Sequence, residues 1–429
     1  MPTSPSMPGA VISAGILRFD VHGRPLANIG NPTYALGAFL LLTLVPYLVP
    51  LEYMELIKIA SPGRHLLICL LLGGSLFAAY SLYAFLFQPR LDLRTDLIQT
   101  GTMETLHRFC TILIWTGIIA NLGLLLWCIP HYRGTIFSMK AALADLEGVN
   151  ILSQSYLFAL GPYIYLSIML GRSYRKTMVW LAVLLTLRAL LLAERLAILE
   201  FAVPVLVVLS LLGQITVPLS RVFLIGAAVP TLFVVGEIFR SFYAKFVQES
   251  GWSHLDLGFI LQWNLERLAL YYADVTNKFY FLLQEQYFYM TDFYLQGVLR
   301  IGSRLGLTER PSSDDLWILI DQFDVSNEEM TNPGGLAVLL SDFGWWGWGV
   351  LALLVFLFFL LHWRAVRGHI LALALYPVFF LTIVELPRFV YLYSSRSLTP
   401  LLLFLMAYAA ALLLAGHGSW MPRPARREV

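Results

Sequence analysis

Charged residues are scarce in this chain. Lys, Arg, Asp and Glu make up 13% of its 429 residues, whereas apolar residues make up 58%. Soluble domains contain about 25% charged residues, so a soluble fold of this composition would expose too much apolar surface. A bilayer removes that difficulty, because apolar side chains can face lipid. The composition therefore predicts an integral membrane protein.

Several functional signatures are missing as well. The net charge of +2 is too small to favour nucleic acid as a partner. The three cysteines, Cys69, Cys110 and Cys128, lie inside apolar runs without metal-ligand spacing, and we interpret them as packing residues. No nucleotide-binding loop, zincin motif or serine elbow occurs in the sequence, so we expect neither a metal nor a cofactor. The N-terminal segment has no basic cluster ahead of an apolar core, which favours a cytoplasmic tail over a signal peptide.

Ten apolar stretches predict transmembrane helices, each of which needs about 20 mostly apolar residues. They are residues 34–50, 65–87, 109–130, 153–171, 177–192, 196–213, 220–239, 345–363, 369–386 and 398–416. Only Ala193, Glu194 and Arg195 separate the fifth stretch from the sixth, so these two could form one broken element. We therefore expect an all-α polytopic membrane protein with about ten transmembrane helices and one large external, partly helical loop.

The distribution of Lys and Arg predicts the orientation. With ten helices, the basic residues of segments 88–108, 171–176 and 362–367 fall on the same side as the Arg-rich C-terminal tail. Short basic loops are normally cytoplasmic. The predicted regions are a cytoplasmic tail at 1–33, helices one to seven within 34–239, a large periplasmic loop at 240–344, helices eight to ten within 345–416, and a cytoplasmic tail at 417–429.

The long loop is acidic and rich in aromatic residues. Residues 240–340 contain 13 Asp and Glu, seven Lys and Arg, and 18 aromatics. Segments 258–273 and 277–301 have the spacing of two amphipathic helices. The aromatics could stack on sugar rings, but we favour the membrane interface for most of them, because Tyr and Trp are enriched there. His254 is the only histidine of this loop and a candidate general base, although a lone His is more commonly an ordinary surface residue.

Two short stretches carry arginines at the predicted external membrane surface. LRALLLAERLAILE contains Arg188 and Arg195, and ELPRFVYLYSSRS contains Arg388 and Arg396. Charges near the membrane are costly and need an explanation. The planar fork of Arg suits phosphate binding, whereas pairing with neighbouring glutamates such as Glu385 is a purely structural alternative. Both interpretations remain open from sequence. If the first is correct, Arg188 and Arg195 are needed for activity and not for folding.

The third notable stretch, TNPGGLAVLLSDFGWWGWG, closes the long loop. Its glycines predict tight turns and close helix packing. Asp342 could be a capping residue as readily as a catalytic one.

Together these residues resemble the Wzy-type polymerases of bacterial O-antigen, capsule and exopolysaccharide synthesis, the xanthan type in particular. The resemblance covers the number of helices and the large external loop before the last spans. It also covers Leu192-Ala193-Glu194-Arg195, which is similar to the family's small-residue-then-Arg stretch, and Asn332 followed by Asp342-Phe343-Gly344, which is similar to its N…DFG stretch. Within the long loop, the Arg-x10-Gly pattern of some members occurs once, at Arg240, instead of twice.

The resemblance implies a GT-C-like glycosyltransferase of the bacterial inner membrane, without a nucleotide at its site. It would transfer the growing chain from undecaprenyl pyrophosphate onto the next lipid-linked oligosaccharide. The residues implied in binding pyrophosphate are Arg188, Arg195, Arg240, Arg388 and Arg396. Asp342, His254 or Glu194 would activate the acceptor hydroxyl. The implied partners are the lipid-linked oligosaccharide, membrane lipid, a chain-length regulator of the polysaccharide co-polymerase type and a flippase.

Other functions share this plan. An O-antigen ligase differs only in its acceptor. A flippase or other transporter of the lipid-linked unit usually shows an internal repeat and ionisable residues in mid-helix. We find no repeat in the sequence, and the charges gather near the predicted outer surface, which favours an enzyme. A structural subunit of a synthesis complex is a third alternative, since the long loop suits docking as well as catalysis.

Overall fold

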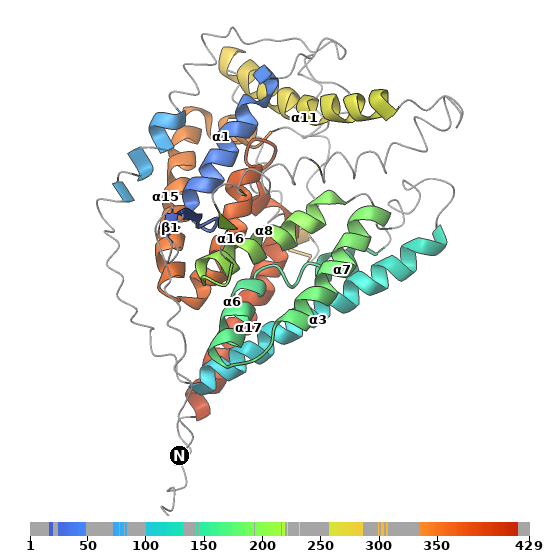
Figure 1. The fold of residues 1–429 in the computed structure, drawn as a ribbon, viewed down its shortest axis with the longest axis vertical. Coiled ribbons are helices and arrows are strands. Elements are labelled where there is room, and N and C mark those ends of the chain that lie inside the picture. The colour runs from blue at the N-terminus through green and yellow to red at the C-terminus, as the bar shows by residue number, and fades with distance from the viewer. Residues whose placement is uncertain are drawn as a thin grey trace, which may run out of the picture.

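The computed structural model describes residues 17–19, 25–48, 72–76, 78–80, 82–83, 100–131, 143, 146–192, 194–215, 217–218, 221, 231, 257–285, 299, 302–303, 306–307 and 334–418. Within these residues the chain is mostly helical (Figure 1). The α-helices are α1 (Pro32–Leu48), α3 (Thr100–Cys128), α5 (Glu147–Leu152), α6 (Leu160–Met169), α7 (Arg175–Leu191), α8 (Arg195–Leu211), α11 (Leu257–Glu285), α14 (Gly335–Phe343), α15 (Gly347–Val366), α16 (Ile370–Glu385) and α17 (Ser395–Gly418). Short 3₁₀ helices are η1 (Ile129–His131), η5 (Gly344–Trp346) and η6 (Tyr391–Tyr393).

Three helical stretches are long and apolar enough to cross a membrane. They are Gly101–His131, Gly335–Val366 and Arg396–Leu414. Four shorter apolar helices accompany them, at Pro32–Thr43, Leu160–Met169, Leu196–Leu211 and Ile370–Glu385. The membrane character expected from composition is therefore present in the fold. The count of ten spans stays a prediction, because most of 65–87 and nearly all of 220–239 lie outside the described residues.

The fourth predicted span is shorter than its apolar sequence suggested. Helix α6 begins only at Leu160, and residues 153–159 form buried turns after α5. Two hydrogen bonds join these turns to α3: Ser155 Oγ donates to the backbone oxygen of Leu113 at 2.7 Å, and Asn121 Nδ2 of α3 donates to the backbone oxygen of Ser153 at 2.7 Å. Irregular backbone at membrane depth is tolerated when it is buried in protein, so these bonds explain the broken helix.

The fifth and sixth predicted spans are two separate helices. Helix α7 ends at Leu191, α8 begins at Arg195, and the two pack against each other. The single broken element that the sequence left open does not form. This turn carries Glu194, so the reversal of the chain fixes where that carboxylate lies.

Helices α3 and α7 run side by side in the same direction. Near their first turns, Arg172 Nη2 lies 3.7 Å from Glu104 Oε1. Further along, Arg188 bonds to Asn121, which follows Glu104 by 17 residues. At about 1.5 Å per residue these two levels are roughly 25 Å apart. This length is close to the hydrocarbon thickness of a bilayer, about 30 Å.

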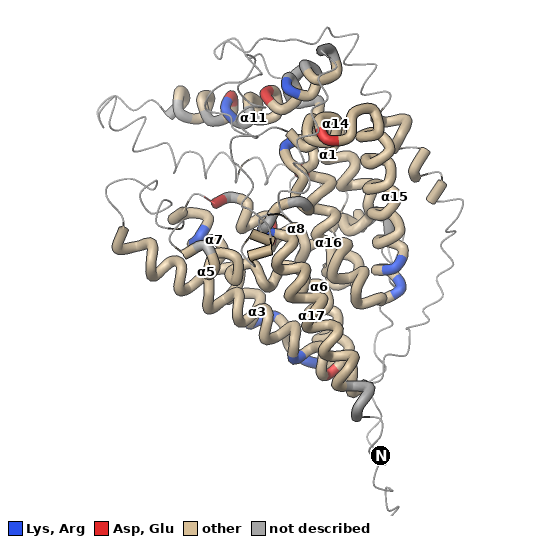
Figure 2. Tube along the Cα trace, turned by 180° about the vertical axis from the view of Figure 1, so that it is seen from behind, with Lys and Arg blue, Asp and Glu red and all other residues tan. Residues whose placement is uncertain are grey.

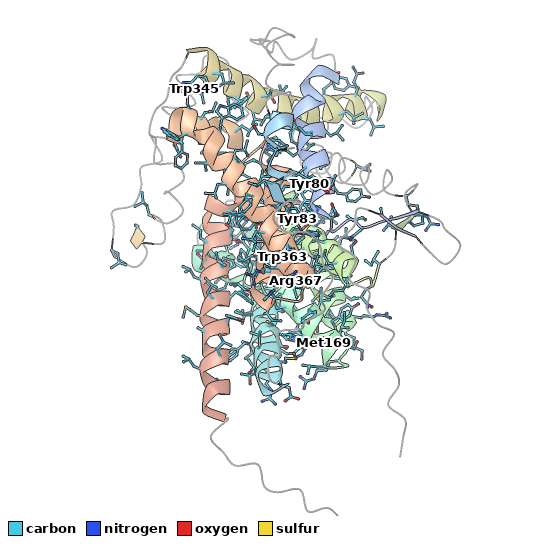
Figure 3. The ribbon with its side chains drawn as sticks, turned by 90° about the vertical axis from the view of Figure 1, so that its left-hand side faces the viewer. Tyr80, Tyr83, Met169, Trp345, Trp363 and Arg367 are labelled. Carbon is cyan, nitrogen blue, oxygen red and sulfur yellow. The ribbon has the colours of Figure 1, made fainter. Side chains whose placement is uncertain are left out.

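Helix α15 carries aromatic residues at both ends (Figure 3). Trp345 and Trp346 are exposed just before its first residue. At the other end the Arg367 guanidinium lies 3.8 Å from the centre of the Trp363 ring. Tryptophans gather where membrane meets water. Trp345 and Trp363 are 18 residues apart, about 27 Å along a helix, which again matches one bilayer crossing.

Helix α11 lies across one end of the molecule, transverse to α15 (Figures 1 and 3). It packs against α1 and α14. The helix is continuous through residues 274–276, where the sequence pattern predicted a break, so that part of the prediction is wrong. Asp274 and Lys278 form a buried ion pair across this point, with 2.7 Å between Oδ2 and Nζ. One helical turn separates these residues, so the pair stabilises the helix there.

Glycines allow α14 to pack closely on its neighbours, as their pattern predicted. Gly334 has a φ of +83°, and an added Cβ there would lie 3.0 Å from the Val275 side chain of α11. At Gly335 an added Cβ would lie 2.2 Å from Leu386 O, just after α16. The end of the long loop is thus held between α11 and the turn that follows α16.

The residues before α1 also belong to the folded body. Strands β1 (Leu17–Phe19), β2 (Pro25–Ala27) and β3 (Val217–Pro218) form a small antiparallel sheet. Gly30 N donates to Ser210 Oγ at 3.2 Å, and Tyr376 donates its hydroxyl to Gly30 O at 2.5 Å. The segment 1–33, predicted as a tail, therefore includes residues that pack on α8 and α16.

Candidate functional site

Charged side chains from distant parts of the chain form one cluster. We call it the arginine–glutamate cluster and define it as Arg188, Glu194, Glu200, Tyr391 and Arg396. They come from the end of α7, the start and second turn of α8, η6 and the start of α17. Elsewhere most helical positions are uncharged, with further charges on α11 and at one end of α15 (Figure 2). The cluster lies at the α3 level of Asn121, one bilayer thickness from the Glu104–Arg172 pair.

Arg188 is buried and held from every side. Nε donates to Glu194 Oε2 at 2.6 Å, and Nη2 lies 2.5 Å from the same oxygen. Nη1 donates to Asn121 Oδ1 at 2.9 Å and to Ser153 Oγ at 2.5 Å, and Nη2 donates to Asn150 Oδ1 at 2.6 Å. A guanidinium has five N–H donors; four of them form these hydrogen bonds, and Nη2 is also ion-paired with Glu194. Only 1% of this side chain is exposed, so Arg188 is fixed and presents no donor outward.

The acceptors around Arg188 are themselves fixed by backbone contacts. Asn121 Nδ2 donates to Gly117 O at 2.8 Å in addition to Ser153 O, which turns its amide oxygen toward Arg188. Ser153 Oγ donates to Asn150 O at 2.6 Å. The buried turns after α5 thus serve to hold one arginine, whose charge in turn orients Glu194.

Arg396 is held more loosely and is more accessible. Its Nε and Nη2 donate to Glu200 Oε1 and Oε2 at 3.2 and 3.3 Å, and its Nη1 lies 4.0 Å from Glu194 Oε1. When the amide oxygen of Gln154 faces the guanidinium, it accepts from Nε and Nη2 at 2.8 and 3.0 Å. The side chain of Arg396 is 28% exposed. It is therefore the guanidinium of the cluster that a ligand can approach.

Tyr391 holds Glu200 from the buried side. Its hydroxyl donates to Glu200 Oε1 at 2.7 Å, and both residues are buried. Burial raises the pKa of Tyr391 well above its usual range, and the negative charge of Glu200 adds to the effect. The phenol therefore keeps its proton and serves as a donor to the carboxylate.

Arg388, the third predicted arginine whose side chain is described, pairs locally. Its Nη1 donates to Glu385 Oε2 at 2.9 Å, three residues earlier. Glutamate pairing, the structural alternative considered from sequence, thus exists for Arg188 and for Arg388. Among the described residues here, three arginines face three glutamates.

The remaining predicted site residues are placed only in part. Asp342 lies in α14 and is buried. The hydrogen bonds and ion pairs that join the described residues of the cluster do not include it. Arg195 is the first residue of α8, but its side chain is not described, and His254 and Arg240 lie outside the described residues. The structure therefore brings together Arg188, Glu194 and Arg396 of the predicted set.

Sequence reasoning missed the polar residues that support the cluster, namely Asn121, Asn150, Ser153 and Gln154. Asn121 carried a usable signal, because an amide inside the apolar run 109–130 needs a hydrogen-bond partner. Asn150, Ser153 and Gln154 sit at the edge of an apolar run and carry no such signal.

Within the described part of the chain, no group of three or more His, Cys, Asp or Glu could hold a metal ion. The chemistry available is that of guanidinium, carboxylate and phenol: binding an oxyanion and accepting a proton. No protein-family model, curated protein or solved structure matches the chain.

Proposed function

We propose that this protein is a membrane-embedded glycosyltransferase that polymerises undecaprenyl-pyrophosphate-linked oligosaccharide units at the periplasmic face of the bacterial inner membrane. The observation that carries the proposal is the accessible guanidinium of Arg396 beside the buried Arg188–Glu194 pair, at the level of one membrane boundary. The resemblance to Wzy-type polymerases agrees with it.

The cost of the cluster supports a functional role. Ionised groups at membrane depth are expensive, even when paired, and usually mark substrate sites. Purely structural cohesion of α3, α7, α8 and α17 needs only apolar packing. A diphosphate that joins a lipid to a sugar lies at a membrane boundary, which is the level we propose for this cluster, and Arg recognises its oxygens bidentately.

In the proposed reaction, a hydroxyl of the acceptor sugar loses its proton to a carboxylate. Its oxygen bonds to the anomeric carbon of the donor, and the bond from that carbon to the pyrophosphate oxygen breaks. The electron pair stays on the pyrophosphate, whose growing charge Arg396 stabilises. Glu194 is the carboxylate best placed to take the proton, because Oε2 is fixed by Arg188 and Oε1 faces Arg396. Arg188 is then a positioning residue.

Arg195, Arg388 and Arg240 remain proposed pyrophosphate contacts, and Asp342 and His254 remain proposed alternatives for the base. The proposed partners are a flippase that supplies the lipid-linked unit and a chain-length regulator of the polysaccharide co-polymerase type.

Deletion of the gene tests the proposal. A polymerase mutant accumulates single lipid-linked repeat units on the periplasmic leaflet, and the wild-type gene restores long chains. Repeat units trapped on the cytoplasmic leaflet would indicate a flippase instead. Long polymer that stays on its lipid carrier would indicate a ligase. Normal polymer would contradict all three assignments.

A further inference from the structure

The two arginines of the cluster are held in different ways. Arg188 is 1% exposed, and its partners lie at 2.5 to 2.9 Å. Arg396 is 28% exposed, and its charged partners lie at 3.2 to 4.0 Å. Short contacts between charged groups are the strong ones, so only the partners of Arg396 are held weakly enough to be exchanged.

Glu200 occupies the edge of Arg396 that an oxyanion would use. One carboxylate oxygen faces Nε and the other faces Nη2. Two phosphate oxygens bind a guanidinium along the same edge. Gln154 can share this edge, but as a neutral amide it leaves without a change in charge. Glu200 is therefore the charged competitor of any anion at Arg396.

We propose that Glu200 is an internal counter-ion of Arg396, that the diphosphate group of a ligand displaces it, and that Tyr391 holds the displaced carboxylate. The proposal rests on the function proposed above and adds a regulatory exchange to its binding site. No bond is made or broken in the exchange. Arg396 passes from one anion to another, and Glu200 keeps its hydrogen bond from Tyr391.

The surroundings explain why Tyr391 is needed. Glu200 is 1% exposed, Arg396 is its counter-ion among the described residues, and a buried carboxylate that loses such a partner is costly. Tyr156 is also close to it and supplies no positive charge, while Arg188 is committed to other partners. The Tyr391 hydroxyl at 2.7 Å is the donor that remains with Glu200 when Arg396 turns to the ligand.

Two conservative substitutions should then act in opposite directions on diphosphate binding. Glu200→Gln removes the charged competitor, so binding should become about tenfold tighter. Tyr391→Phe removes a hydrogen bond that is worth more once Arg396 no longer shares the charge of Glu200, so binding should become weaker, by up to about tenfold. Glu104→Gln is the matched control, because it takes the carboxylate from Arg172, another Arg–Glu pair, at the opposite level of the same helices. Its affinity should equal that of the wild type.

The measurement is calorimetric titration of purified, detergent-solubilised full-length protein. The probes are inorganic pyrophosphate and, separately, farnesyl pyrophosphate, which distinguish a bare diphosphate from one carried by a lipid. Each variant is first checked for a single elution peak and for its thermal unfolding temperature. If Glu200→Gln does not fold, the sign of the Tyr391→Phe change still decides, because an uninvolved tyrosine leaves the affinity unaltered.

The outcomes separate the exchange from the proposed function. Tighter binding by Glu200→Gln together with weaker binding by Tyr391→Phe supports the exchange. If the wild type binds and either variant has an unchanged affinity, or an affinity changed in the opposite direction, the exchange is wrong but the diphosphate site stands. Failure of the wild type to bind either probe overturns both the exchange and the pyrophosphate site. Polymer formation in cells, measured independently, then shows whether the protein is a polymerase at all.

Discussion

Arg188 and Glu194 form the closest ion pair of the cluster, with Nε and Nη2 of the arginine lying 2.6 and 2.5 Å from one carboxylate oxygen, Oε2. The other oxygen, Oε1, lies 4.0 Å from Arg396. One carboxylate therefore stands between an arginine that cannot move and one that a ligand can reach. Arg188 sets the orientation of Glu194, and Arg396 is the arginine beside Glu194 at which a ligand would bind.

Substitution of Arg188 by Lys should lower stability as well as activity. Lys keeps the charge but offers three donors in place of five, so some of Asn121, Asn150 and Ser153 lose their bonds inside the protein. We expect a loss of roughly 3 kcal/mol, seen as a lower thermal unfolding temperature of the purified protein. Because Arg188 is buried, we expect it to matter for folding as well as for activity, in contrast to the prediction from sequence that it matters for activity alone. An Arg188→Lys variant with normal unfolding and no activity would restore that expectation.

Substitution of Arg396 should abolish product formation without loss of protein, provided that Glu200 is neutralised too. Arg396→Ala alone leaves a buried carboxylate without its counter-ion, which is destabilising. The double variant Arg396→Ala/Glu200→Gln avoids this. We expect normal protein levels in membranes, loss of polymer and accumulation of lipid-linked units, with Glu200→Gln alone as control. If protein level and product fall together in the double variant, Arg396 is structural.

Local patterns in the sequence predicted the helices better than the site. Apolar runs predicted the positions of α3, α15, α16 and α17, because the apolar residues that mark such a helix all lie within the helix itself. The Glu385–Arg388 and Arg188–Glu194 pairs were also visible, since their members are close in sequence. Glu200 and Arg396 are 196 residues apart, and no local spacing can predict such a pair. The helix predicted for residues 153–159 does not form for a related reason: hydrogen bonds with α3, which is distant in sequence, hold these residues in turns.

The proposed topology predicts the side on which reporter fusions are active. Fusions at residues 174, 366 and 425 should report the cytoplasm, and a fusion at residue 300 should report the periplasm. The Lys and Arg distribution motivates this prediction. The separation of about 25 Å between the Glu104–Arg172 pair and the Asn121–Arg188 contact agrees with it. A periplasmic signal at 366 or a cytoplasmic signal at 300 would refute the arrangement.

The buried pair of Asp274 and Lys278 should control how firmly α11 is docked. Burial lowers the pKa of Lys278, and the carboxylate of Asp274 opposes that shift. Asp274→Asn removes the carboxylate that pairs with a buried ammonium, so we expect a loss of roughly 3 kcal/mol and faster hydrogen exchange in residues 257–285.

The same pair gives a pH dependence and a rescue. Because the pKa of Lys278 is lowered, the unfolded chain binds this proton more tightly than the folded protein does. The loss of stability of Asp274→Asn relative to the wild type should therefore shrink as the pH rises toward the usual pKa of Lys. The double variant Asp274→Leu/Lys278→Met should be more stable than Asp274→Asn, because it buries no charge. If the double variant is less stable than Asp274→Asn, the ion pair contributes more to stability than the mutual neutralisation of two buried charges.

The balance of two arginines against two glutamates in the arginine–glutamate cluster has a kinetic consequence. Opposite charges placed side by side produce a field that falls off much faster with distance than that of a net charge. Long-range attraction, which speeds the capture of anions from bulk solution and weakens as salt is added, needs such a net charge. The described part of the cluster has none, so it distinguishes an anion only on contact. Such a site suits a ligand that arrives sideways within the leaflet, already held at the right depth by its own hydrocarbon chain, and its capture rate should depend little on ionic strength.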